Sequence, residues 1–186
     1  MDDFLKRLKH ESRVSEEALS AIKLWLVDSR FESFKSAIKE LVDRQLWEEL
    51  DDSFYTHLKI GTGGIRGVIG VGPNRINSRT ISEAAQGLCN FIVDTKGADG
   101  NSDCVVVGYE ARKSSKQFAI LSCRILAANG VRSQLFDGPR STPELSFAVR
   151  HLGATAGVQI TASHNPRTDN GFKFYWSDGA QIVPPD

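Results

Sequence analysis

The stretch Gly157-Val-Gln-Ile-Thr-Ala-Ser-His-Asn-Pro166 is followed directly by Arg167-Thr-Asp-Asn-Gly-Phe-Lys-Phe-Tyr-Trp176. Its apolar centre predicts a short buried strand, and Pro166, which fixes its own φ and has no N–H to donate, predicts a loop after it. Asn170-Gly171 predicts a tight turn at positive φ. The last five residues have the period-2 pattern of a half-buried strand. The whole stretch therefore predicts a strand, a loop, a turn and a second strand.

This order places the Ser163 hydroxyl at the carboxyl end of one strand and the Lys173 ammonium at the start of the next. Ligands of open α/β sheets bind at that carboxyl edge. A serine hydroxyl needs a positioned base to act as a nucleophile, and His164, its neighbour in an extended segment, is expected to point away. A phosphorylated Ser163 would instead carry negative charge that Lys173, Arg167 and His164 can bind. A polar loop whose serine caps a turn is the alternative interpretation.

The residues before this stretch predict two more buried strands. Short apolar runs occupy 104–107 and 131–136. A helix from about Ser114 separates them, and Gly130 is placed to end it. With the strand at 156–161 they form a β-α-β-α-β unit, in which short connections imply parallel strands and right-handed crossovers.

Two further helices flank these strands. Thr80-x-x-Glu83 fits a capping box at the start of one helix, and Thr142-Pro143 predicts the N-cap and first position of the other. Antiparallel strands at 65–71 and 172–176 would extend the sheet. The predicted fold class is α/β, a three-layer α/β/α sandwich with a mixed, mainly parallel sheet.

An N-terminal helical extension is predicted over residues 1–58. Apolar residues recur there at helical spacing, for example Leu19, Ile22 and Leu26. Trp25 and Trp47 could belong to a partner surface, but aromatic residues at this spacing favour core packing. We expect two domains, 1–58 and 59–186.

The composition excludes several classes of function. Lys plus Arg and Asp plus Glu both total 23, so the chain lacks the basic excess of a protein that binds nucleic acid or an anionic membrane. The chain starts with charged residues and has no apolar segment of membrane-spanning length, which argues against a signal peptide or transmembrane helix. Three cysteines without metal-ligand spacing predict reduced thiols and a cytoplasmic location.

A glycine-rich segment, Gly61-Thr-Gly-Gly-Ile-Arg-Gly-Val-Ile-Gly-Val-Gly72, holds six glycines in twelve residues. Such density permits positive φ and close approach of the backbone to a ligand. No G-x-x-x-x-G-K-[ST] motif is present. By itself the segment favours a structural turn and strand over a phosphate-binding loop.

Several motifs together resemble one family. Thr161-Ala-Ser-His-Asn-Pro166 followed by Asn170-Gly-Phe-Lys173 is similar to the phosphoserine loop of the α-D-phosphohexomutases. The resemblance extends to Gly61-Thr-Gly-Gly-Ile-Arg-Gly67, to Val105-Val-Val-Gly-Tyr-Glu-Ala-Arg112 and to Gly179-Ala-Gln-Ile-Val-Pro-Pro185, about two-thirds of the chain. Within the family, the chain most resembles the first domain of the phosphoglucomutase/phosphopentomutase branch.

The resemblance implies catalytic roles for three residues. Ser163 would carry the phosphoryl group, donate it to a sugar monophosphate and recover a phosphoryl group from the bound sugar bisphosphate. Lys173 would transfer a proton or stabilise charge beside that group, and Arg66 would hold it. The net reaction moves phosphate between O1 and O6 of a hexose, or O5 of a pentose.

The resemblance also implies binding roles. His164 would contact phosphate or sugar, and Asn165 would shape the loop and contribute to phosphate binding. Arg112 would lie close to the loop, supporting it or contributing to phosphate binding, although an arginine after a strand can also simply cap a carbonyl or pair with Glu110. Phosphorylated Ser163 would give Mg²⁺ one oxygen ligand.

Remaining Mg²⁺ ligands and the sugar-recognition loops lie in further domains of the family, whose motifs this chain does not contain. We therefore expect the first domain of a longer mutase, inactive by itself, with a small-molecule sugar phosphate and the missing domains as its partners. The alternative is a non-catalytic module that binds a sugar phosphate or a partner. Within the enzyme class, phosphopentomutase or phosphomannomutase activity competes with phosphoglucomutase activity.

Overall fold

The structure is a computed structural model that describes residues 8, 14–61, 63–96 and 104–183. The chain divides into two compact units: residues 1–58 with 69–77 form the first, and residues 59–68 with 78–186 form the second. The start of the predicted helical extension, apart from Leu8, lies outside the described residues. In the part that the structure describes, no helix has the length and apolar character needed to cross a membrane.

The first unit is helical, as predicted. Its elements are α2 (Glu16–Val27), the 3₁₀ helix η1 (Ser29–Phe34), α3 (Lys35–Asp43) and α4 (Trp47–Phe54). Trp25 and Trp47 are 4% and 8% exposed and belong to the core of this unit. Trp25 stacks on Phe31 with ring centroids 4.4 Å apart. The two tryptophans are therefore core residues, which confirms the prediction that was favoured over a partner surface.

Residues 69–77 join this helical unit although they lie beyond its sequence range. The Arg75 guanidinium donates to the Asp52 carboxylate at 2.6 Å, and the Asn74 N–H donates to the Ser53 carbonyl at 3.1 Å. Gly72, with φ of 115°, lets the backbone approach the Ser53 carbonyl where a side chain would overlap it. The glycine-rich segment thus leaves the sheet after Val68 and packs on α4.

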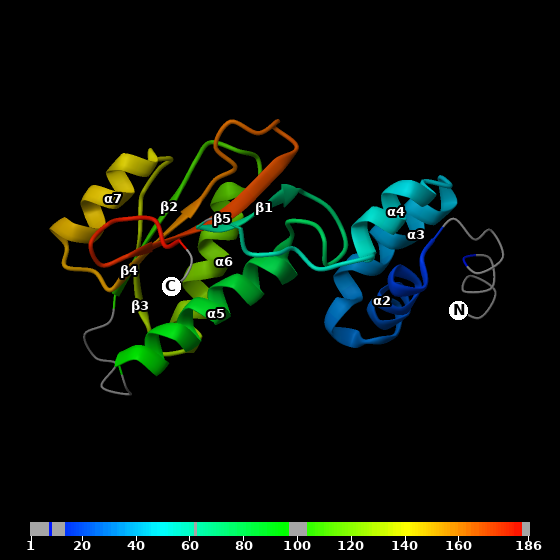
Figure 1. The fold of residues 1–186 in the computed structure, drawn as a ribbon, viewed down its shortest axis with the longest axis horizontal. Coiled ribbons are helices and arrows are strands. Elements are labelled where there is room, and N and C mark those ends of the chain that lie inside the picture. Colours follow the sequence, from blue (N-terminus) through cyan, green and yellow to red (C-terminus); the bar gives the residue numbers. More distant parts are fainter. Residues whose placement is uncertain (1–7, 9–13, 62, 97–103, 184–186) are drawn as a thin grey trace. The chain divides into compact units, whose positions relative to one another are not determined.

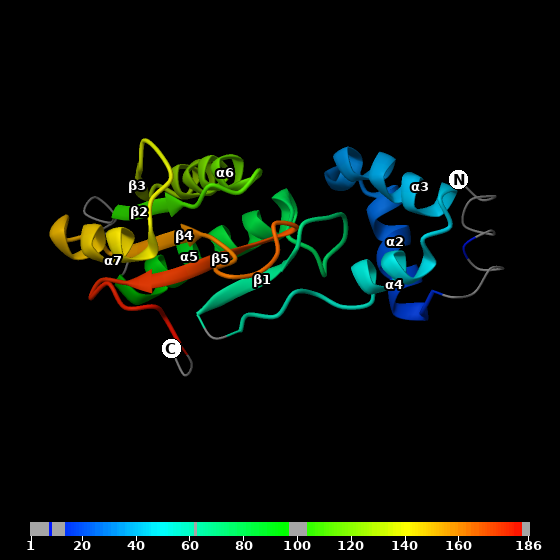
Figure 2. The ribbon, with the colours of Figure 1, turned by 90° about the horizontal axis from the view of Figure 1, so that it is seen from above.

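The second unit is built on one five-stranded sheet in the order β1-β5-β4-β2-β3. Its strands are β1 (Gly64–Val68), β2 (Cys104–Tyr109), β3 (Arg132–Leu135), β4 (Ala156–Ile160) and β5 (Asp169–Trp176). Strand β2 pairs in parallel with β3 and β4, while β5 runs antiparallel to β4 and β1. Figure 2 shows β1 beside β5 at one edge. The sheet is mixed, as predicted.

Helices cover both faces of this sheet (Figure 1), α5 (Ser78–Lys96) and α6 (Ser115–Ala128) on one face and α7 (Thr142–His151) on the other. Because side chains alternate along a strand, Val106 faces α7, where it joins a core with Leu145, Val149 and Tyr175. On the opposite face, Phe91 of α5 contacts Trp176 of β5 with ring centroids 5.2 Å apart. This is the predicted three-layer sandwich.

Two predicted helix starts were wrong. α5 begins at Ser78, so Thr80 lies inside the helix and is buried. α7 is capped by Ser141, one residue before the predicted cap, and the Glu144 carboxylate accepts hydrogen bonds from both the Ser141 N–H and hydroxyl at 2.8 Å. At both starts Ser and Thr residues lie within two positions of one another, so the sequence alone does not single out the residue at which the helix begins.

The predicted turn at Asn170-Gly171 was also wrong, because both residues lie inside β5. Gly171 pairs with Arg66 of β1 and does not have positive φ. A Cβ at Gly171 would lie 2.5 Å from the Ile65 carbonyl oxygen and 2.8 Å from that of Thr161. Close packing of the neighbouring strands, and not a turn, therefore requires this glycine.

Candidate phosphate-handling site

Ser163 lies in the loop between β4 and β5, at the carboxyl end of β4, as predicted. Its side chain is exposed, and its φ of 56° is in the left-handed region that non-glycine residues rarely adopt. The Thr161 hydroxyl accepts a hydrogen bond from the Ser163 N–H at 2.9 Å. The Ser163 Oγ lies 3.4 Å from His164 Nδ1. The expectation that these side chains point apart was wrong, because the segment is not extended at Ser163.

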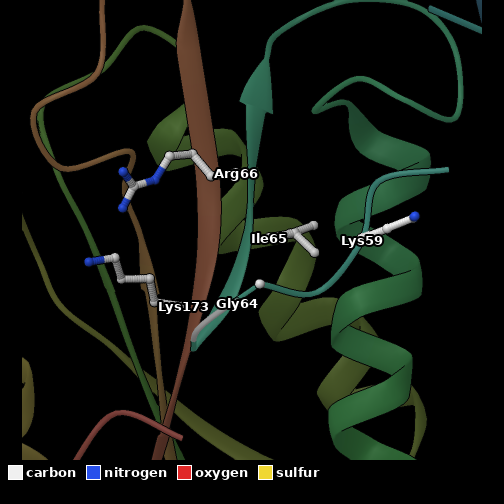
Figure 3. A pocket seen from close by; sticks show the side chains of 6 residues that line it. Lys59, Gly64, Ile65, Arg66 and Lys173 are labelled. Atoms are coloured by element: carbon white, nitrogen blue, oxygen red, sulfur yellow. The ribbon is translucent and has the colours of Figure 1, made fainter. Parts of the chain in front are cut away.

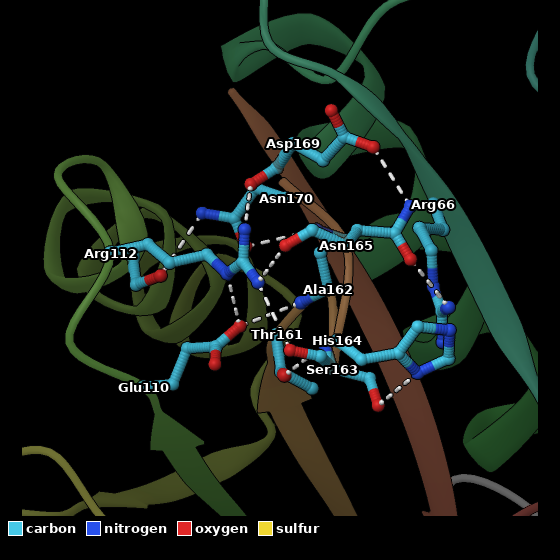
Figure 4. A network of polar contacts seen from close by, with 12 residues as sticks. Arg66, Glu110, Arg112, Thr161, Ala162, Ser163, His164, Asn165, Asp169 and Asn170 are labelled. Carbon is cyan, nitrogen blue, oxygen red and sulfur yellow. Dashed lines mark hydrogen bonds and ion pairs between the residues drawn. The ribbon is translucent and has the colours of Figure 1, made fainter. Parts of the chain in front are cut away.

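The Arg112 side chain extends into this loop and holds it through several hydrogen bonds (Figure 4). Its Nη1 donates to the carbonyls of Pro166 and Asp169, and its Nη2 to those of Ser163 and Asn165, at 2.5–3.0 Å. All five N–H donors of the guanidinium are engaged once the Nε contact with Glu110 at 2.6 Å is added. In this geometry the arginine supports the loop and has no N–H left for a phosphate.

Glu110 completes the support from the carboxyl end of β2. Its Oε1 also accepts a hydrogen bond from the Ala162 N–H at 2.7 Å, so one carboxylate oxygen ties Arg112 to the residue before Ser163. From the sequence, Glu110 is expected only as a possible ion-pair partner of Arg112. The contact with Ala162 exists because β2 and β4 are neighbours in the sheet. The sequence alone does not specify this strand pairing.

Arg66 and Lys173 share one face of the sheet. Arg66 lies opposite Gly171 and Gly64 lies opposite Lys173, so the two cations are diagonal neighbours on adjacent strands. Figure 3 shows both side chains extending in the same direction, whereas Lys59 extends away from them. These residues line a pocket of about 230 Å³ with Ile65 and the glycine-rich loop.

Burial lowers the pKa of the Lys173 ammonium, and the nearby Arg66 cation lowers it further, while Glu110 acts in the opposite direction. A lowered pKa makes the ammonium a better proton donor. Lys173 sits in the middle of β5, between Gly64 and Gln159 of the flanking strands. The predicted position at the start of a strand was wrong, because β5 begins four residues earlier at Asp169.

Two glycines bring the backbone of the glycine-rich segment close to its neighbours. A side chain at Gly64 would overlap the Phe172 carbonyl, and one at Gly63, where φ is 78°, would overlap the side chain of Gln181. The backbone of the glycine-rich segment therefore lies directly against β5. This supports a close backbone approach as the reason for the glycine density.

Asn165 connects Arg66 to the loop. Its Oδ1 accepts from Arg66 Nη1 at 2.9 Å, and its Nδ2 donates to the Asp169 carboxylate at 2.8 Å. Asp169 was not predicted as a site residue from the sequence. Its spacing of two residues from Gly171 and four from Lys173 places all three on the same face of β5. The Arg140 guanidinium pairs with the Asp137 carboxylate at 2.8 Å.

The described residues contain no group of three or more His, Cys, Asp or Glu side chains that could hold a metal ion. The three cysteines are free thiols. The assembled site is therefore an exposed serine on a tightly held loop, with a histidine beside it and an arginine and a lysine aligned on the adjoining strands. Serine, histidine, arginine and lysine together are suited to holding and transferring a phosphoryl group.

The family described as phosphoglucomutase/phosphomannomutase, alpha/beta/alpha domain I, matches residues 57–186. A phosphoglucomutase of Staphylococcus haemolyticus is 41% identical over 147 residues, 79% of this chain and 26% of that protein. A phosphoglucomutase of Staphylococcus aureus strain USA300 is 43% identical over 147 residues, again covering 79% of this chain and 26% of that protein.

A solved structure shows the same family resemblance. A Thermus thermophilus protein, described provisionally as a phosphomannomutase, superposes with a TM-score of 0.62 at 36% identity over 69% of this chain and 28% of that chain. The chain belongs to the phosphoglucomutase/phosphomannomutase family and contains its domain I. It spans about a quarter of the length of the curated relatives that it matches.

Proposed function

We propose that this chain is the phosphoserine domain of an enzyme that moves a phosphoryl group between two hydroxyls of a sugar phosphate. The observation that carries the proposal is the exposed Ser163 hydroxyl on a loop held by Glu110 and Arg112, with Arg66 and Lys173 aligned on the adjoining strands. Family membership supports the same reaction class.

In this proposal the phosphoryl group passes from Ser163 Oγ to a hydroxyl of the bound sugar phosphate. The P–O bond to Ser163 breaks, a P–O bond to the sugar oxygen forms, and the hydroxyl proton passes to solvent, from which Lys173 regains the proton that it gives to the serine oxygen. Lys173 supplies positive charge, and a proton, to the departing serine oxygen, for which its lowered pKa is suited. Arg66 holds the phosphoryl oxygens. The reverse transfer, from the other phosphate of the sugar bisphosphate, restores phosphorylated Ser163.

His164 and Asn165 line the same loop. The His164 imidazole, 3.4 Å from the Ser163 hydroxyl, is placed to contact the phosphate or the sugar. Asn165 shapes the loop through contacts on both sides of its amide. We assign Arg112 to loop support, since its donors are engaged with protein atoms.

Mg²⁺ fits this arrangement only in part. One ligand would be an oxygen of phosphorylated Ser163, and the remaining ligands would come from groups other than the described carboxylates of this chain. When bound, the ion would neutralise phosphoryl charge during the transfer. We place the protein in the cytoplasm on the basis of its free thiols.

We favour a glucose phosphate as substrate over a pentose or mannose phosphate, because the curated relatives at 41–43% identity carry the name phosphoglucomutase. Substrate recognition would reside mainly outside this chain, which spans 26% of those relatives. For the same reason we expect the 186-residue chain by itself to lack mutase activity.

The experiment combines peptide mapping and activity. The native gene product, purified from its source cells, should carry phosphate on the peptide containing Ser163 and interconvert glucose 1- and 6-phosphate in a coupled assay. Ser163→Ala should abolish both signals. Ser82→Ala should preserve them, because Ser82 is a half-buried serine on α5 whose hydroxyl donates to the Ser78 carbonyl. Unmodified Ser163 together with sugar-phosphate binding and no turnover would support the non-catalytic module instead.

A further inference from the structure

Asp169 is a buried carboxylate beside the proposed site. Its side chain accepts hydrogen bonds from the Thr168 hydroxyl at 3.0 Å and from Asn165 Nδ2 at 2.8 Å, and the residue is 8% exposed. A carboxylate so far removed from water is costly unless it is bound by donors. The burial of Asp169 therefore depends on these hydrogen bonds.

The position of Asp169 in β5 places it beside Arg66 and Lys173. Residues 169, 171 and 173 lie on one face of the strand, since side chains alternate. Arg66 lies opposite Gly171, between Asp169 on one side and Lys173 on the other. The absent side chain of Gly171 leaves the arginine free to extend across the face toward the Ser163 loop (Figure 4).

Three groups form a polar relay with a fixed direction. The Asp169 carboxylate only accepts hydrogen bonds, and the Arg66 guanidinium only donates them. The Asn165 amide between them has one acceptor and one donor end. Its NH₂ must therefore face Asp169 and its oxygen must face Arg66, as observed. Without Asp169 the amide can turn over, and its NH₂ would then oppose the N–H groups of the arginine.

The interposed amide also keeps the arginine available. A direct ion pair would take up two N–H groups of Arg66 and neutralise much of its charge. Of the three guanidinium nitrogens of Arg66, only Nη1 has a hydrogen-bond partner among the described residues. An exposed arginine otherwise loses rotamer entropy when it is fixed, so a guanidinium that is already held binds a phosphoryl group at lower entropic cost.

We propose that Asp169 is a positioning residue, which acts through Asn165 to hold Arg66 over the phosphoryl group on Ser163. The inference rests on the proposed function. It adds the residue that sets the direction of the Asn165 amide and so prepares the arginine for the transferring group.

The first measurement tests the relay in the unphosphorylated chain, by NMR of the Arg66 guanidinium. In the wild type, rotation about the Nε–Cζ bond should be slowed by the Asn165 contact. Asp169→Asn should speed it, and the exchanged pair N165D/D169N should slow it again, because a carboxylate at 165 accepts from the arginine and an amide at 169 donates to that carboxylate. Asn165→Ala removes the hydrogen bond to Arg66 directly. It should also speed the rotation, and it serves as the test if D169N perturbs the strand.

The second measurement uses the chain with phosphoserine incorporated at 163 and follows the phosphate pKa by ³¹P NMR. Removing an anion by itself lowers a nearby phosphate pKa, whereas losing the held arginine raises it, by about 0.5 unit for one charge near 5 Å in water. Asn165 separates Asp169 from Arg66, so the arginine would be the charge nearer the phosphate and its effect should prevail. We therefore expect both D169N and Arg66→Gln to raise the pKa. Asp137→Asn, an exposed carboxylate paired with Arg140, is the matched control and should leave it unchanged.

The outcomes separate this inference from the proposed function. Unchanged guanidinium rotation in D169N, or a phosphate pKa that falls, would overturn the positioning role. Absence of phosphate from Ser163 in the native protein would instead overturn the proposed function, while the guanidinium measurement on the unphosphorylated chain would still report whether Asp169 orients Arg66.

Discussion

Replacing Arg112 by alanine should destabilise the α/β unit by about 2 to 4 kcal/mol, between the cost of breaking an exposed ion pair and that of removing one partner of a fully buried one. The Arg112 side chain is 12% exposed, and that of its partner Glu110 is 28% exposed. The substitution removes the Glu110 contact and four hydrogen bonds to loop carbonyls. The carbonyls at the protein surface can bind water instead, so the full sum of five hydrogen bonds is not lost.

Arg140→Ala is the matched control. Its side chain is 36% exposed and pairs with Asp137 and Glu144, whose side chains are 87% and 54% exposed, so the expected cost is about 0 to 1 kcal/mol. The two substitutions remove the same chemical group from the same unit. Only the burial and the number of partners differ.

Amide hydrogen exchange is the appropriate assay, because it reports each unit of the chain separately. The slowest amides of β2 and β4, such as Val107 and Ile160, report unfolding of the whole α/β unit, and those of 163–168 report the loop. R112A should accelerate both sets, and the loop more than the strands. A loss for R112A within about 0.5 kcal/mol of that for R140A would refute the argument that this arginine supports the loop.

Two further predictions concern the strands beside the site. Gly171→Ala should lower the free energy of unfolding by about 1 to 3 kcal/mol, because the added Cβ would meet two strand carbonyls. Gly87→Ala, at a helical glycine with open space around it, should instead raise it by about 0.5 to 1 kcal/mol. Denaturant unfolding of the two variants measures both changes. Arg66→Gln should raise the Lys173 pKa, measured by NMR titration of the lysine side chain. Because this pKa is lower in the folded chain, the unfolded chain binds more protons, so stability should rise with pH from the folded pKa toward about 10.4, and Lys173→Met should flatten that rise. Equal stability changes for the two glycine variants, or a Lys173 pKa that is unchanged in the arginine variant, would contradict these expectations.

The order of elements was predictable because burial and periodicity are local properties. The run at 104–107 is apolar on both faces, the pattern of a strand covered by two helical layers. Gly130, with φ of 75°, follows the last turn of α6 as predicted. Ser163, Lys173 and Arg66 were identified from short motifs, whose residue types and spacing are visible without any knowledge of the fold.

Helix starts and the turn were less predictable for an equally physical reason. Ser141 and Thr142 are both capable N-caps, and the choice depends on whether Glu144 can reach back to the cap. Asn170-Gly171 has the composition of a turn, but its glycine is required by the carbonyls of neighbouring strands. Local composition cannot separate these two uses of glycine.

The sequence by itself determined the α/β pattern, the buried strands, the residues available for phosphoryl chemistry and the resemblance to a family. Only the tertiary structure decided how they are used: Arg112 engages five acceptors around the loop, and Asp169 reaches Arg66 through Asn165. The strand pairing and loop geometry that create these contacts bring together residues that are up to 99 positions apart. Hydrogen bonds depend on distance and direction in space, which spacing along the chain does not specify.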